Sequence, residues 1–305
     1  MGAPLGMAAR LASTLAAATL AVLVCATAAG ASSHPANVQW EQYLPALPTG
    51  TAVQPHGVPF CRTASVRCVD VEVQRLRGAQ RRFRCDHRGV FATTYLELTR
   101  MLRATLRRDP HFFRWPRYLY FEDALFADVY FNTLTAYARG RPVAPAWQIA
   151  LDTARAGQVN GAQDMLLGIN AHVQNDMPFV LAALGLRTPK GESRKPDHDK
   201  VNLILDAAYE PVVRAVASRY DPFVSTTNAS WDPLDDAGGL EMVKAWREEV
   251  WRNSERLLNA RSADERRQVA TQIQQGAAQW ARMIAAPQSP GSRATRDAYC
   301  REHWK

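Results

Sequence analysis

"LLGINAHVQNDMPFVL", residues 166–181, places a polar centre between two apolar flanks. The flanks predict one buried helix over residues 160–184, because apolar side chains dominate on both sides of the centre. The polar residues of the centre are Asn170, His172, Gln174, Asn175 and Asp176. Burying polar groups is unfavourable unless each finds a hydrogen-bond partner. The stretch therefore predicts either an internal polar network or a site that holds a ligand.

The chain around this stretch also has a helical pattern. In residues 87–107 apolar side chains recur at the spacing of an α-helix, and residues 117–140 are apolar nearly all round, as in a central buried helix. Ser262 and Glu265 have the spacing of a capping box, which marks a helix start. Further helices are predicted at 144–157, 198–220, 240–258 and 262–285. The fold class is therefore all-α, with a single multi-helix, bundle-like domain over residues 86–285.

The first 31 residues have the features of a secretory signal peptide. One positive charge, Arg10, precedes a run of Ala, Leu, Val and Thr, and small residues follow near Ala28 and Ala31. A membrane anchor is the alternative, but the run is only weakly hydrophobic. No later stretch approaches the roughly 20 apolar residues of a spanning helix. We therefore expect a secreted protein with no membrane span after signal removal.

Four cysteines remain after signal removal, Cys61, Cys68, Cys85 and Cys300. An even number in an oxidising compartment predicts two disulfides, with three connectivities open. A zinc site is the alternative, but no paired C-x-x-C units are present. Residues 32–85 are expected to be a mostly irregular, disulfide-pinned segment with a short strand or hairpin at 65–77. If both disulfides form, the tail, residues 286–305, is tied back through Cys300.

The chain is basic, with a formal net charge of +8. A basic surface attracts anionic partners such as lipid headgroups or polymers, although it is more often a solvated face. No nucleic-acid-binding motif accompanies the arginines, so specific nucleic-acid binding is not expected. The sequence does not predict the oligomeric state.

His172 and Asp176 are the candidate catalytic residues. Their spacing of four places both on one face of a helix, where a carboxylate can orient the imidazole or share a metal ion with it. Asp123 and Asp199 lie on other predicted helices, and convergence of the four would form a site for zinc, manganese or iron. The residues expected to orient a substrate are Asn170, Asn175 and Asn202. The alternative is a buried network that only fixes packing.

Motifs of the known nucleophilic and nucleotide-binding enzymes are absent, so family resemblance is the remaining guide. Over about residues 86–215 the chain resembles an uncharacterised, mostly bacterial helical family, domain of unknown function 5995. The residues that match its pattern are Gly168, Asn170, Ala171, His172, Asp176, Met177 and Pro178, with Asp123 and Asp199 to Asn202. The resemblance implies a helical fold and no particular reaction, since the family has no established activity.

"HVQNDMP", residues 172–178, is also similar to the His-x-x-x-Asp stretch of the helical zinc phospholipases C and related single-strand nucleases. The chain lacks the histidine that follows the proline there and a second H-x-x-x-(H/E) pair, so a trinuclear zinc centre is not expected. Two functions stay open. The first is a metal-assisted hydrolase of an anionic phosphodiester or lipid-like substrate, which needs a cavity that solvent can reach. The second is a non-enzymatic secreted binding or structural protein, whose polar residues lie in a sealed, fully paired interior.

Overall fold

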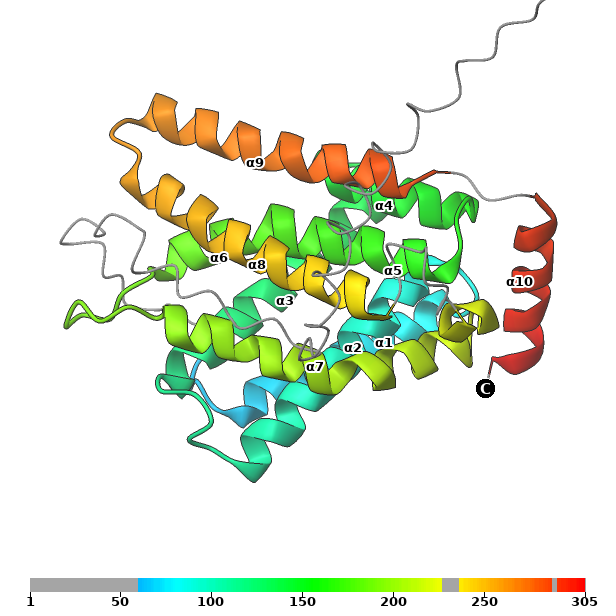
Figure 1. The fold of residues 1–305 in the computed structure, drawn as a ribbon, viewed down its shortest axis with the longest axis horizontal. Coiled ribbons are helices and arrows are strands. Elements are labelled where there is room, and N and C mark those ends of the chain that lie inside the picture. Colours follow the sequence, from blue (N-terminus) through cyan, green and yellow to red (C-terminus); the bar gives the residue numbers. More distant parts are fainter. Residues whose placement is uncertain (1–59, 227–235, 287–289, 305) are drawn as a thin grey trace, which may run out of the picture. The chain divides into compact units, whose positions relative to one another are not determined.

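The computed structural model describes residues 60–226, 236–286 and 290–304. The expected signal peptide and the first part of the 32–85 segment lie outside the described residues. Within those residues the chain is all-α and forms no strand, apart from one isolated bridge between Arg187 and Ser193. Figure 1 shows the helices packed along one another, as the bundle-like prediction required. None of the described helices is long and apolar enough to cross a membrane.

The first helix corrects a prediction. Residues 65–77 were expected to form a strand or hairpin, but α1 (Val66–Phe83) is helical. Val69, Val73 and Leu76 lie at helical spacing and are fully buried, which an alternating strand pattern does not explain. This face packs on α2 (Arg88–Arg108). The acidic residues Asp70 and Glu72, which separate Val69, Val71 and Val73, gave the segment its false alternation.

The remaining helices are α3 (Pro116–Ala138), α4 (Pro145–Ala156), α5 (Gly161–Asn170), α6 (Met177–Leu184), α7 (Lys195–Ala217), α8 (Asp236–Asn259), α9 (Ala263–Ile284) and α10 (Pro290–His303). They follow the predicted order as far as α9, whereas α10 lies in the tail, where no helix was predicted. A short 3-10 helix, η3 (Pro222–Thr226), follows α7. As predicted, Ser262 caps α9 by accepting a hydrogen bond from the Glu265 backbone N–H (3.1 Å).

The predicted helix over residues 160–184 is continuous but changes its winding in the middle. Between α5 and α6, residues Ala171–Asp176 form the π-helix η2. Asn160 begins α5 with a full capping box to Gln163, and the helix ends at Gly185. A π-helical turn holds one residue more than an α-helical turn, and such turns are frequent at functional sites. The change of winding covers the "AHVQND" of the opening stretch.

Both predicted disulfides are present. Cys61 pairs with Cys68, and Cys85 pairs with Cys300. The second bond confirms that the tail is tied back, although most of the described tail is the helix α10 rather than an irregular end. Arg296 of α10 also donates a hydrogen bond to the Gly157 carbonyl (3.2 Å) beyond α4. The carboxyl-terminal helix is thus held by a covalent bond and by a buried arginine.

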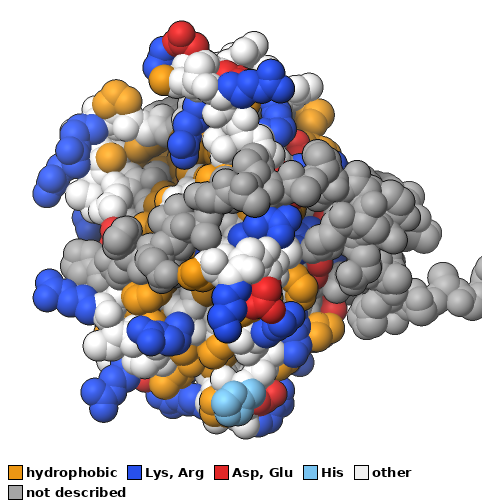
Figure 2. Space-filling view, turned by 90° about the vertical axis from the view of Figure 1, so that its left-hand side faces the viewer, with side chains coloured by type: hydrophobic (Ala, Val, Ile, Leu, Met, Phe, Trp, Pro, Cys, Tyr) orange, Lys and Arg blue, Asp and Glu red, His pale blue; other side chains and the backbone are white. Residues whose placement is uncertain are grey.

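Lys and Arg side chains are spread over the face of the molecule in Figure 2 rather than gathered in one patch. Hydrophobic and uncharged side chains separate them. This distribution agrees with a solvated basic surface. It adds no support for a nucleic-acid groove.

Candidate functional site

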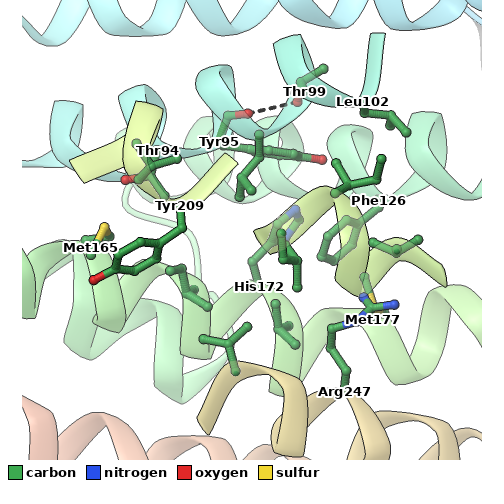
Figure 3. A pocket seen from close by; sticks show the side chains of 18 of the residues that line it. Thr94, Tyr95, Thr99, Leu102, Phe126, Met165, His172, Met177, Tyr209 and Arg247 are labelled. Carbon is green, nitrogen blue, oxygen red and sulfur yellow. Dashed lines mark hydrogen bonds between the residues drawn. The ribbon is translucent and has the colours of Figure 1, made fainter. Parts of the chain in front are cut away.

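A cavity of about 200 Å³ lies between α2, α3, α5, η2, α6, α7 and α8. Most of its lining is hydrocarbon, and Figure 3 shows these side chains converging from the surrounding helices. The deepest lining residues, including Phe91 and His172, are buried, whereas Leu98, Tyr209 and Leu240 are half-buried. The lining therefore reaches from the core to partly exposed positions. This differs from the sealed interior that was expected for a binding or structural protein.

His172 presents one ring nitrogen to this cavity. Its Nδ1 lies 3.0 Å from Asp176 Oδ2, and its ring stacks on Phe126 with centroids 3.4 Å apart. Burial lowers the pKa of His172, so the neutral imidazole is favoured, and the nearby Asp176 carboxylate opposes the shift only in part. Nδ1 then donates to Asp176. The remaining Nε2 is buried without a hydrogen-bond partner among the described residues and is left as an acceptor.

Asp176 itself does not line the cavity. Its Oδ2 accepts a hydrogen bond from Trp147 Nε1 (2.8 Å) as well as from His172, and its Oδ1 accepts one from Asn175 Nδ2 (2.7 Å). Three donors therefore converge on one buried carboxylate. This arrangement fixes the orientation of the imidazole, which is what the spacing of four residues predicted.

The three predicted substrate-orienting asparagines have protein partners. Asn170 donates to the Ala277 carbonyl of α9 (2.9 Å) and accepts from Gln174 (2.7 Å). Asn175 donates to Asp176, and Asn202 accepts from Arg247 Nε (2.8 Å). None of the three lines the cavity. Their role toward a substrate stays a prediction, while their role in holding the helices together is visible.

The four predicted metal ligands are not brought to one point. Asp123 lines the cavity but interacts with Glu72 of α1. Asp199 is hydrogen-bonded to Lys195, which lies one turn away on the same helix, α7. Lys195 is fully buried and also bonds Glu248 (2.9 Å), so Asp199 serves as one of its counter-ions. No group of three or more His, Cys, Asp or Glu residues in the described part of the chain is placed to hold a metal ion. The expected convergence is therefore not found.

The pair formed by Glu72 and Asp123 is a second polar feature of the cavity wall. Burial raises the pKa of Asp123 to about 6. Burial and then the nearby Asp123 charge raise the pKa of Glu72 well above its usual value. Glu72 also accepts a hydrogen bond from Thr99, which lines the cavity (3.1 Å). Two buried carboxyls cannot both ionise easily, so the pair holds a proton at neutral pH.

Arg247 and Glu122 are lining residues that the sequence reasoning missed. Arg247 of α8 is 4% exposed, and it is the one Lys or Arg among the described residues that line the cavity. Glu122 is buried, and burial raises its pKa to about 7 although the Arg247 charge lowers it. A sequence signal existed for Arg247, which lies at helical spacing from the buried Val243 and Val250. An arginine on an apolar helix face needs a partner inside the fold.

Comparison with known families finds one match for the chain. Residues 69–287 match a family of unknown function, DUF5995. The chain belongs to this family. The match reaches from α1 to the end of α9 and includes every residue that lines the cavity, so it extends beyond the resemblance seen in residues 86–215. The chain matches no curated protein and no solved structure.

Proposed function

We propose that this DUF5995 protein binds an apolar small molecule in its interhelical cavity. The observation that carries the proposal is the cavity itself, about 200 Å³ of space with a largely hydrocarbon wall. Protein interiors are close-packed, and unfilled space of this size is unfavourable unless it has a use. An engineered apolar cavity of about 150 Å³ stays dry and takes up benzene. The cavity here would take a hydrocarbon chain or a fused ring.

This proposal is a form of the second function left open by the sequence, a non-enzymatic binding protein. It differs in that the interior holds a ligand site and is not sealed. The two disulfides support the further proposal that the chain is exported, because structural disulfides persist in oxidising compartments. An exported protein with an apolar cavity suits a ligand that is poorly soluble in water.

Fluorescence of 1-N-phenylnaphthylamine, a neutral probe that brightens in apolar surroundings, tests the binding proposal. Leu205 lines the cavity, whereas Leu203 on the same helix is 51% exposed. Leu205→Trp should fill the space and abolish probe binding, and Leu203→Trp should leave binding unchanged. Equal binding by the two variants, or no binding by the wild type, would contradict the proposal.

His172 supports a second candidate function, hydrolysis of a lipid-like ester. His172 lines the cavity, its Nε2 has no partner among the described residues, and Asp176 holds the opposite nitrogen. In this proposal Nε2 takes a proton from a water molecule as the water oxygen attacks the ester carbonyl. The proton then passes to the departing alkoxide, and the products are an acid and an alcohol. No metal ligand set is needed for these steps.

Turnover of p-nitrophenyl decanoate distinguishes hydrolysis from binding alone. His172→Gln and Asp176→Asn should each lower the rate, by roughly 10² to 10⁴-fold for His172→Gln. The control is His198→Gln, since His198 is also buried but bonds the Arg247 backbone carbonyl (3.1 Å) and does not line the cavity. A wild type without activity that still binds the probe would leave the protein a binding protein. Elemental analysis of the same preparation would detect zinc, manganese or iron.

A further inference from the structure

We propose that Arg247 is a headgroup site, and that the cavity takes a monocarboxylic acid with a hydrocarbon body. This inference rests on the proposed binding function and names the chemistry of its ligand. It begins from the partners of the Arg247 guanidinium. Nε donates to Asn202 Oδ1 (2.8 Å), Nη2 donates to the His198 carbonyl, and Nη1 contacts Met177 Sδ at 3.6 Å. All three partners are uncharged.

Two other buried cations have carboxylate partners of a kind that Arg247 lacks. Lys195 contacts Asp199 and Glu248, and Lys244 contacts Asp206 (2.6 Å) and Glu241 (2.8 Å). Arg247 has no carboxylate within ion-pair distance in the described part of the chain, although it is as deeply buried. The charges of Glu122, Asp199 and Glu248 act on Arg247 from beyond that distance, and a counter-ion in direct contact would offset more of the cost of burying the guanidinium. Arg194 and Arg296 are also buried, but their guanidinium groups bond backbone carbonyls and do not line the cavity.

The open side of Arg247 is the cavity. Figure 3 shows its side chain entering beside Met177, with His172 and Phe126 further along the wall. The Nη1 group has two N–H donors, and its described contact is a thioether sulfur, which is a weak acceptor. An anion in the cavity would therefore meet an under-used donor at the polar end and hydrocarbon elsewhere.

Glu122 lines the same cavity and fits this assignment. Of the carboxyls that act on Arg247, that of Glu122 has the largest effect and lines the cavity, although the two form no direct ion pair. With a pKa of about 7, Glu122 is protonated in much of the population near neutral pH and can then donate a hydrogen bond to a bound carboxylate. The other charged groups that act on Glu122 are Asp123 of its own helix and Asp197 and Arg194 of the neighbouring segment.

A carboxylate suits this site better than a phosphate. The cavity offers one cation, and a phosphomonoester brings between one and two negative charges at neutral pH. A carboxylate brings one charge and matches the planar fork of a guanidinium. The hydrocarbon lining then accounts for the remainder of the ligand, as in a free fatty acid.

Titration calorimetry with three molecules of equal chain length tests the assignment on the wild type. We expect decanoate to bind at least about tenfold more tightly than decan-1-ol, because a hydrogen bond to a charged group contributes more than one to a neutral group. Decylamine should bind most weakly. If the probe binds and decan-1-ol binds at least as tightly as decanoate, the assignment of Arg247 as a headgroup site is wrong, but the proposed binding function is retained. If neither the probe nor decanoate binds, both proposals fall.

Variants then locate the effect. Arg247→Met should remove the preference for decanoate over decan-1-ol while keeping probe binding, and Arg247→Lys should restore part of it. Arg256→Met is the matched control, because Arg256 lies on the same helix, is exposed and bonds Asn253 (2.8 Å). Loss of the preference in the control, or its persistence in a folded Arg247→Met protein, would overturn the assignment. If Arg247→Met does not fold, the wild-type comparison decides alone.

Discussion

Two groups of buried polar residues lie side by side along η2, and they differ in how their hydrogen bonds are used. Asn170, Asn175 and Asp176 form hydrogen bonds to neighbouring helices or to one another, although Asn175 Oδ1 has no partner among the described residues. His172, whose Nε2 has no partner among the described residues, and Arg247 line the cavity instead. The first group holds the fold together and the second can receive a ligand. Polarity in a buried helix therefore indicates a site only where a residue with unused hydrogen-bonding atoms also lines a cavity, which Asn175 does not.

The largest expected effect belongs to the first group. Asp176→Ala removes the acceptor of three buried donors, from Trp147, His172 and Asn175. We expect a loss of about 3–5 kcal/mol in the free energy of unfolding, because those donors stay buried and unpaired. Urea unfolding followed by circular dichroism measures it. In the control, Asp128→Ala breaks a half-exposed contact with Arg75 (3.4 Å) and should cost less than about 1 kcal/mol. Similar losses would remove the distinction between the two groups.

Glu122 lines the cavity beside the second group, and Glu122→Gln tests it through the pH dependence of stability. The folded protein holds the Glu122 proton up to a pKa of about 7, whereas the usual value is 4.5. Stability from this group is present below pH 4.5 and is lost as the pH rises through 7. Glutamine does not ionise, so the variant should gain on the wild type over that range, by up to about 3 kcal/mol.

Denaturant unfolding between pH 5 and pH 8 checks this prediction. The matched control is Glu249→Gln on α8, whose side chain lies in solvent. Its stability relative to the wild type should stay flat over the same range. A flat difference for Glu122→Gln as well would mean that Glu122 is ionised and fully paired, which would weaken its assignment to the ligand site.

Gly168→Ala tests how closely the helices on either side of His172 approach. A Cβ at Gly168 would lie 2.3 Å from Phe91 Cγ, and the Phe91 ring in turn contacts His172 edge-on. We expect a loss of about 2 kcal/mol from overpacking and a reduced affinity for the fluorescent probe. Thermal unfolding and probe titration measure the two effects.

Gly276→Ala is the control, because the added methyl group meets open space within α9. It should stabilise the protein slightly, by up to about 1 kcal/mol, through helix propensity. A neutral Gly168→Ala would show that the Phe91 wall of the cavity can move. The close approach of α5 to α2 would then not be needed for the shape of the site.

The helical domain was predictable because its signal is local. Apolar side chains at helical spacing indicate helices whatever they pack against, and the cap at Ser262 depends on residues close in sequence. The same local logic failed at 65–77, where three valines at alternate positions, Val69, Val71 and Val73, imitate a strand. Local spacing also predicted the contact between His172 and Asp176, which are one helical turn apart.

The sequence by itself determined an all-α chain, the polar centre of the 160–184 helix, the pairing of His172 with Asp176 and the return of Cys300 to the amino-terminal segment. The tertiary structure alone decided that Asp199 serves Lys195, that Asp123 faces Glu72, and that Arg247 and Glu122 line a cavity with His172. The physical reason is the distance along the chain over which each feature is encoded. Helix formation and contacts within one turn follow from neighbours in the chain, whereas a cavity arises from side chains on seven elements whose packing no single segment encodes.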